Sequence, residues 1–111
     1  MKGDSLGEFE ELVLLAVCGL GTEAYANSIK TEVESHAGRT YNLSAIHASL
    51  YRLEDKGFLK SHMGDPTQKR GGKRKRIFQP TNMAINALKK SREIRESLWQ
   101  NIDLASLKMA N

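Results

Sequence analysis

The sequence predicts one mainly α-helical domain with a small β-hairpin near its middle. Three segments with apolar residues at helical spacing are followed by two short strand-like segments, and a long amphipathic helix closes the chain. The length of 111 residues suits a single hydrophobic core, and 40% apolar with 27% charged residues is a globular composition. The sequence has neither internal repeats nor a linker, so we expect one compact unit.

The first helix is expected within SLGEFEELVLLAVCGLG, residues 5–21. Ser5 and Glu8 have the S-x-x-E spacing of a capping box, and Gly19 and Gly21 are expected to stop the helix. Apolar residues fall on several of its faces, which predicts that other elements cover this helix on more than one side.

The apolar run of this first helix also bears on the location of the protein. The run is too short to span a bilayer, and it follows acidic residues where a secretory signal carries basic ones. The single cysteine, Cys18, lies in the run and cannot form an internal disulfide, so the chain does not require an oxidising compartment. We expect a cytoplasmic protein in which Cys18 is a small buried residue.

The second and third helices are predicted over residues 22–38 and 43–57, on either side of a short polar link. Thr22 is the expected cap of the second helix, and Gly38 and Gly57 follow the two helix ends. The inward stripe of the third helix consists of Ile46, Leu50 and Leu53. Two helices of this length across a short turn form a candidate helix-turn-helix.

After residue 57 the apolar pattern changes from a helical to a strand-like period. The short segments FLKSHM and RIFQP flank GDPTQKRGGKRK, which holds turn formers and basic residues. Six of the eight residues from Lys69 to Arg76 are Lys or Arg, and the other two are glycines. We expect a hairpin with a basic tip, which completes a winged helix-turn-helix over residues 1–80.

The C-terminal segment, residues 81–111, begins with a last helix that Thr81 is expected to cap and that extends to about residue 102. One stripe along this helix is apolar or small and consists of Ala84, Ala87, Leu88, Ser91, Ile94, Leu98 and Ile102, with Trp99 at its edge. Little chain remains to cover the stripe, so an amphipathic helix of this length predicts a second subunit. The stripe is the expected dimer interface.

The predicted winged helix-turn-helix suits double-stranded DNA. Small and polar residues begin the exposed face of the third helix and can approach base edges in the major groove. The residues of this helix expected to contact DNA are Ser44, Ala45, His47, Ala48, Tyr51 and Arg52. The residues of the wing expected to neutralise phosphates or enter the minor groove are Lys69, Arg70, Gly71, Gly72, Lys73, Arg74, Lys75 and Arg76. Phosphate contacts supply affinity and orientation, so the sequence preference is expected to lie in the third helix.

The sequence leaves alternatives open. The basic tip is compatible with a solvated loop, with an acidic protein partner, and with binding of DNA or RNA at low specificity. His47 is compatible with an exposed helix residue that makes no contact. Trp99 is compatible with dimer core and with a stacking surface for a flat ligand. Tyr25 is expected to pack against the third helix.

The sequence carries no recognisable catalytic or metal-binding constellation. His36, His47 and His62 share no ligand spacing with Cys18. Phosphate-binding loops, nucleophile elbows and dinucleotide-binding motifs are also missing from the sequence. We therefore expect neither enzymatic activity nor a bound metal or cofactor.

Three segments, EAYANSI, LSAIHASLYRLEDKGFL and RGGKRKRIFQPT, resemble the PadR family of bacterial transcriptional regulators. The resemblance covers almost the whole chain, about residues 6–102. The family pattern L-x-R-L-E-x-x-G-L-I is matched by Leu50, Arg52, Leu53, Glu54, Gly57, Phe58 and Leu59. The third segment resembles the family's wing return, G-R-x-R-K-Y-Y-x-L-T. The chain departs from the family at His47 and Ala48, where Tyr-Pro is usual.

The resemblance implies a homodimer that is joined through the C-terminal helix and binds a pseudo-palindromic operator, generally as a repressor. It also implies that some members release DNA when they bind small, often aromatic, molecules. The short C-terminal region resembles the smaller branch of the family, which has one dimerisation helix. In such a dimer the Trp99 pair would lie near the interface, so Trp99 is the expected effector contact.

Overall fold

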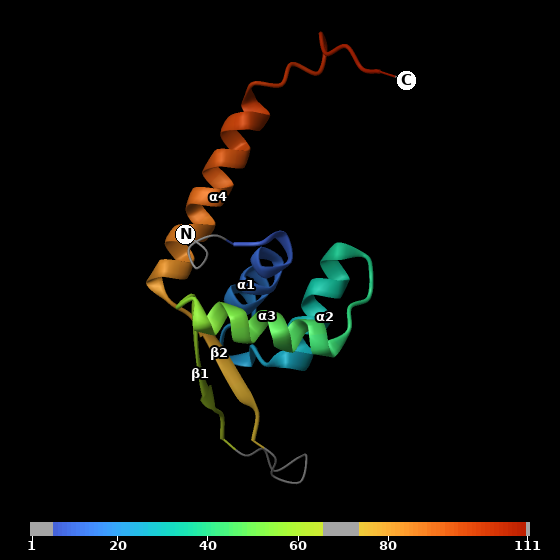
Figure 1. The fold of residues 1–111 in the computed structure, drawn as a ribbon. Coiled ribbons are helices and arrows are strands. Elements are labelled where there is room, and N and C mark those ends of the chain that lie inside the picture. The colour runs from blue at the N-terminus through green and yellow to red at the C-terminus, as the bar shows by residue number, and fades with distance from the viewer. Residues whose placement is uncertain (1–5, 66–73, 111) are drawn as a thin grey trace.

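The computed structural model describes residues 6–65 and 74–110, and Figure 1 shows the arrangement of the chain. The elements are α1 (Glu8–Leu20), a short 3-10 turn η1 (Gly21–Glu23), α2 (Ala26–Ala37), α3 (Leu43–Asp55), β1 (Leu59–Met63), β2 (Arg76–Pro80) and α4 (Asn82–Gln100). Helices α1, α2 and α3 form a body from which the hairpin and α4 project at opposite ends (Figure 1). The predicted fold class, mainly α with a small β-hairpin in a winged helix-turn-helix, is confirmed.

The core lies between the three helices of the body and the base of the hairpin. The predicted inward stripe of α3 is confirmed, because Ile46, Leu50 and Leu53 have no exposed surface. Leu14 of α1 and Ile29 of α2 are equally buried. Each such side chain contributes about 1.5–3 kcal/mol when it leaves water. Burial on this scale fixes the exposed face of α3 relative to the rest of the domain.

The ends of α1 differ from the prediction. Helix α1 begins at Glu8 with Gly7 as its cap residue. Glu8 is therefore the first residue of the helix and not the third, where the glutamate of a capping box lies. The Gly7 N–H donates to Glu10 Oε1 at 2.8 Å. Ser5 lies outside the described residues. Gly19 lies inside the helix, and the chain leaves it at Gly21, where φ is 59° and a glycine is favoured.

The start of α2 also differs from the prediction. Thr22 lies in η1 and does not cap α2, which begins four residues later at Ala26 with Tyr25 as its cap residue. The Tyr25 N–H donates to Ser28 Oγ at 3.1 Å. The Phe78 N–H of the hairpin donates to the Ala24 carbonyl at 2.9 Å, and this contact holds the segment before α2 extended against β2. The predicted end of α2 is confirmed at Gly38.

The hairpin pairs β1 with β2 in antiparallel register, from Leu59 opposite Pro80 to Met63 opposite Arg76. Gly57, which has a φ of 87°, turns the chain from α3 into the hairpin. Thr81 links the hairpin to α4, because its hydroxyl donates to the Gly57 carbonyl at 2.8 Å and accepts from the Ala84 N–H at 3.3 Å. The predicted cap at Thr81 is thereby confirmed.

The apolar contacts of α4 with the body lie in its first half, and the helix then extends beyond the body (Figure 1). It ends at Gln100, two residues before the expected end. The molecule is 60 Å long and 30 and 21 Å across. Within residues 6–65 and 74–110, no helix has both the length and the apolar character to cross a membrane.

Candidate nucleic-acid interface

The exposed face of α3 has small side chains in its first half. Ser44, Ala45 and Ala48 are exposed, and the burial of the opposite stripe keeps them at the surface. The His47 ring stacks on the Tyr51 ring one turn later, with centroids 6.0 Å apart and an interplanar angle of 24°. A helix with this profile can approach base edges closely and carries two polar aromatic rings beside the approach.

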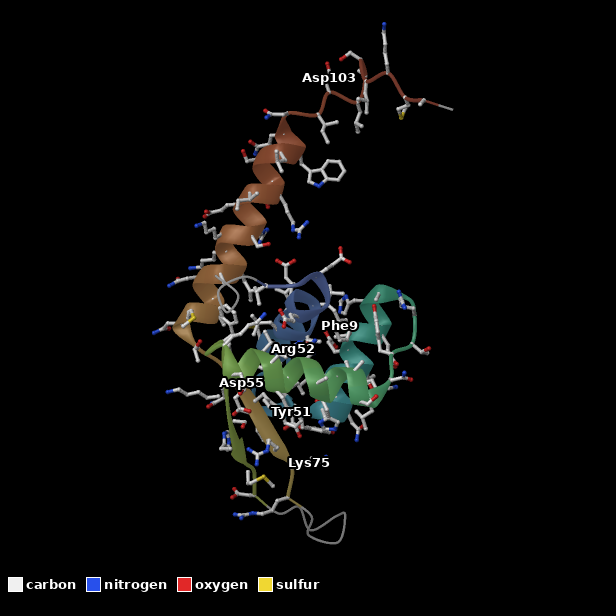
Figure 2. All side chains as sticks on the ribbon, viewed as in Figure 1. Phe9, Tyr51, Arg52, Asp55, Lys75 and Asp103 are labelled. Carbon is white, nitrogen blue, oxygen red and sulfur yellow. The ribbon has the colours of Figure 1, made fainter. Side chains whose placement is uncertain are left out.

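A hollow of about 240 Å³ lies where the start of α2, the exposed face of α3 and strand β2 meet. We call it the junction hollow, and its lining residues are Tyr25, Ala26, Asn27, His47, Tyr51, Lys75, Arg76 and Phe78. Figure 2 shows Tyr51 and Lys75 on the side of α3 that faces the hairpin. The first turn of α2 presents the positive end of its helix dipole at this place. The junction hollow therefore combines cationic and hydrogen-bonding groups beside the small face of α3.

Two residues of the junction hollow were missed by sequence reasoning as interface residues. Tyr25 is half-buried, and the Lys75 ammonium lies over its ring, 3.9 Å from the centroid. This cation–π contact orients Lys75 toward the hollow and spans fifty residues of sequence. Asn27 is exposed at the first turn of α2. No local pattern predicts either position, because the hairpin brings Lys75 back to α2 only in the folded chain.

Two consecutive hydrogen bonds connect the strands of the hairpin to α3. Arg76 Nη1 donates to Ser61 Oγ at 3.0 Å, and Ser61 Oγ donates to Glu54 Oε2 at 2.6 Å. Together they connect β2 through β1 to the last turn of α3. Arg74 is exposed, whereas the predicted phosphate contacts Lys69, Arg70, Gly71, Gly72 and Lys73 lie outside the described residues.

Arg52 has a structural partner that the sequence did not indicate. Its Nε donates to Glu10 Oε2 at 3.2 Å, although 55% of its side chain is exposed. Figure 2 shows Arg52 on the side of α3 toward α1, away from the hairpin. Arg52 therefore differs from the other predicted DNA contacts of α3, because one of its donors already joins two helices of the body.

Glu10 is the buried centre of this joint between α1 and α3. Only 7% of its side chain is exposed, and Lys56 Nζ lies 2.8 Å from Oε1 and 3.1 Å from Oε2. Burial alone would raise the pKa of Glu10, but hydrogen bonds from Lys56, the Gly7 N–H and Arg52 hold that pKa below its ordinary value. The carboxylate is therefore ionised at neutral pH and fixes the start of α1 to the end of α3.

The exposed end of α3 carries a negative charge. Asp55 is exposed and lies four residues after Tyr51, about one turn further along the same face. A carboxylate repels phosphate, so the C-terminal end of this face is unfavourable for DNA. The favourable region of α3 is its first half, next to the junction hollow.

The predicted dimer residues divide into two groups. Ala84 has no exposed surface and packs in the chain's own core, so it has none to offer a partner, and Ala87 and Leu88 are partly buried against the same core. The exposed group consists of Ile94 at 52%, Leu98 at 64%, Trp99 at 65% and Ile102 at 42%. Ser91, between the two groups, is half-buried, and its hydroxyl donates to Glu11 of α1. The exposed part of the predicted interface is therefore the second half of α4 together with Ile102, which follows the helix end. Whether this half forms a dimer stays a prediction.

Trp99 borders a second hollow, of about 360 Å³, between α1 and α4. We call it the α1–α4 hollow, and its lining residues are Glu11, Leu15, Leu88, Lys89, Arg92, Arg95, Glu96 and Trp99. It joins an aromatic ring and two leucines to charged groups of both signs. These are the contact types that an aromatic molecule with a polar substituent would use.

Other predicted sites have simpler outcomes. Cys18 is half-buried, which corrects the expectation of full burial, and its partial burial raises the pKa of its thiol. Across the described part of the chain, no group of three or more His, Cys, Asp and Glu side chains is placed to hold a metal ion.

Comparison with known proteins gives matches to structures alone. No family model matches the sequence, and no curated protein matches it. RosR of H. salinarum is similar with a TM-score of 0.69 and 20% identity, over 88% of this chain and 81% of that chain. A PadR-family transcriptional regulator from Eggerthella lenta has a TM-score of 0.62 and 22% identity, over 80% and 75% of the two chains.

A PadR-like transcription factor from Bacteroides fragilis is similar with a TM-score of 0.66 and 20% identity, over 83% of this chain and 84% of that chain. The similarity covers 80% or more of this chain in all three cases. The chain therefore has the fold of PadR-like transcriptional regulators, as the sequence resemblance predicted.

Proposed function

We propose that this protein is a homodimeric, sequence-specific DNA-binding transcriptional regulator. The observation that carries the proposal is the junction hollow, where Lys75, His47 and Tyr51 converge beside the small exposed face of α3. The fold that the chain shares with PadR-like regulators supports the same function.

The first half of α3 and the junction hollow contact different parts of the DNA. Ser44, His47 and Ala48 contact base edges from the first half of α3, and hydrogen bonds to bases there determine the sequence preference. The junction hollow takes a backbone phosphate, which Lys75 neutralises and Asn27 and Tyr51 hydrogen-bond. Asp55 keeps the duplex away from the other end of α3.

The basic tip extends the phosphate contacts along the duplex. Each cation that neutralises a phosphate releases counterions, so affinity falls as salt rises. The neutralising double variant Lys73→Ala with Arg74→Ala weakens binding to all sequences and reduces the salt dependence by about two contacts. An unchanged salt slope would show that the tip does not contact phosphate.

The second half of α4 joins the two subunits. Ile94, Leu98 and Trp99 are large, exposed and on one stripe, which is the pattern of a helix that buries this face against a second copy. A twofold dimer matches a pseudo-palindromic operator, because each subunit contacts one half-site.

An effector site in the α1–α4 hollow is part of the proposal. A flat aromatic molecule would stack on Trp99 and pair with Arg92 or Arg95 there. The regulator acts as a repressor that such a molecule releases. Titration of candidate aromatic compounds while the Trp99 emission and the amount of bound DNA are followed tests both statements.

A gel-shift titration with and without competitor DNA tests the core of the proposal. We expect the protein to retain a duplex selected from the genome of its source when random duplex is present in excess. Equal loss to random duplex would indicate a binder of low specificity, and no binding to any duplex would favour a protein-interaction module instead.

A further inference from the structure

Two consecutive carboxylates at the start of α1 contact two different helices. Consecutive residues of a helix point about 100° apart, so Glu10 and Glu11 face different neighbours. Glu10 binds Lys56 and Arg52 at the end of α3. Glu11 binds Ser91 and Arg95 on α4. One turn of α1 is thus bonded both to the helix proposed to contact DNA and to the helix proposed to join the subunits.

The contact of Glu11 with α4 is a second attachment point for that helix. The Ser91 hydroxyl donates to Glu11 Oε2, and Arg95 Nη2 lies 3.5 Å from Glu11 Oε1. The Glu11 side chain is 17% exposed, and the Arg95 side chain is 63% exposed. We call Glu11, Ser91 and Arg95 the α4 latch. Because Arg95 is this open to solvent, its ion pair with Glu11 contributes little to overall stability. The effect of the α4 latch is on the position of α4 relative to α1.

The α4 latch lies further along α4 than the apolar contacts, so it can restrict the tilt of the helix. The first attachment is apolar and lies near the start of the helix, at Ala84, Ala87 and Leu88. Ser91 and Arg95 follow Leu88 by three and seven residues, about 4.5 and 10 Å along the axis. A helix held only at its start can tilt about that point, whereas a helix held at two points has a fixed angle to the body.

A small tilt of α4 has a large effect at its far end. For the 19 residues of α4, a tilt of about 10° at the start moves the far end by about 5 Å, because a helix rises about 1.5 Å per residue. Successive base pairs are about 3.4 Å apart, so this movement exceeds one base pair. In a dimer joined through the far ends, the tilt of α4 determines the separation of the two α3 helices.

We propose that Glu11 is a positioning residue that, through Ser91 and Arg95, fixes the angle of α4 to the body and thereby sets the half-site spacing that the protein accepts. This inference rests on the dimeric DNA-binding function proposed above. Glu10 completes the connection, because it holds α3 to the same turn of α1. The α1–α4 hollow is lined by Glu11 and Arg95, so a molecule bound there acts directly on this angle.

The test compares affinities for duplexes that differ only in spacing. A palindromic duplex selected from random DNA by the unaltered protein is remade with its spacer one and two base pairs shorter and longer. We expect the unaltered protein to prefer one spacer over its neighbours by about tenfold or more, a penalty similar to that of one mismatched pair. In Glu11→Ala this preference falls to about threefold or less, while the affinity for an isolated half-site is unchanged.

Three further variants separate position from charge. Glu11→Gln keeps an oxygen for Ser91 but loses the ion pair with Arg95. Its spacer preference should therefore lie between that of the unaltered protein and that of Glu11→Ala. Ser91→Ala in the Glu11→Ala background has no additional effect, because the two residues act in one contact. Glu8→Ala, an exposed acid on the same turn of α1, keeps the full preference.

A distance measurement without DNA gives an independent readout. Spin labels at Ser35→Cys in a Cys18→Ser background report the separation of the two bodies in the dimer. We expect a narrow distribution in the otherwise unaltered protein and a broad one with Glu11→Ala. An equally narrow distribution together with an unchanged spacer preference in Glu11→Ala overturns the role of Glu11. A monomeric protein, or one that selects no duplex, overturns the proposed function itself.

Discussion

The two halves of α4 carry one apolar stripe but differ in what covers it. Ala84 is fully buried in the core, whereas Leu98 and Trp99, both about four turns later, are 64% and 65% exposed. The body of the chain accounts for the first half, since it buries those side chains. The second half retains a pattern that is favourable only when another molecule covers it. The difference shows that periodicity identifies an apolar face but not the molecule against which it packs.

The largest effect is expected in the first half of α4. Ala84→Asp places a charge in the core with no partner, which should lower the free energy of unfolding by at least about 3 kcal/mol. Urea denaturation measures the change, and Asn86→Asp, on an exposed position of the same helix, should shift the midpoint little. A loss below about 1 kcal/mol in Ala84→Asp would contradict the burial of this half.

The second half should respond to charge in a different way. Leu98→Glu should leave the unfolding of the single chain almost unchanged but raise the dimer dissociation constant by about a hundredfold or more, because an interface core does not tolerate an unpaired charge. Sedimentation velocity over a range of concentrations measures the constant. Gln100→Glu is the matched control, because Gln100 is exposed and lies about 160° around α4 from Leu98. A dimer of equal strength in Leu98→Glu would mean that another surface joins the subunits.

The contact between α1 and α3 depends on Glu10. The pKa of Glu10 is lowered in the folded chain, so its contribution to stability is complete above the unfolded value of about 4.5 and is lost as pH falls through the folded pKa. Glu10→Gln should lower the free energy of unfolding by about 1.5–3 kcal/mol at pH 7, the usual contribution of a hydrogen bond to a charged group.

Measurement of unfolding from pH 7 down to pH 3 gives the difference between Glu10→Gln and the unaltered protein. The difference should shrink as the pH falls, while the exposed control Glu8→Gln should show no such trend. A difference that stays constant with pH would show that the ionised carboxylate of Glu10 is not what joins α1 to α3.

The smallest effect is expected in the fluorescence of Trp99, without a change in the free energy of unfolding. Trp99 is the single tryptophan of the sequence, and it lies on the exposed half of α4. Its emission should shift to the red on dilution as the dimer dissociates, and Leu98→Glu should show the red-shifted emission at all concentrations. An emission that does not change with concentration while sedimentation reports dissociation would place Trp99 outside the interface.

The sequence predicted what depends on local periodicity. The stripe of Ile46, Leu50 and Leu53 and the cap at Thr81 follow from spacing and residue type, and both are confirmed. The predicted cap at Thr22 was wrong, because a tertiary contact overrides the local capping preference. This contact is the hydrogen bond from the Phe78 N–H to the Ala24 carbonyl.

The sequence could not predict contacts between distant charges. Glu10 pairs with Arg52 and Lys56 across more than forty residues, and Lys75 lies on Tyr25 across fifty. Periodicity places each of these side chains on a surface but does not specify which opposite charge or ring it meets. The wing was therefore predicted as a set of cations, whereas the junction hollow required the folded chain.

The most direct test of the central claim compares Lys75→Ala with His47→Ala on selected and random duplex at several salt concentrations. Lys75→Ala should weaken both duplexes by a similar factor and reduce the salt slope by about one, because it removes one phosphate contact. His47→Ala should keep the slope and narrow the ratio between selected and random duplex by about tenfold, the worth of one base contact. If neither variant changes the slope or the ratio, the junction hollow and α3 do not form the DNA interface.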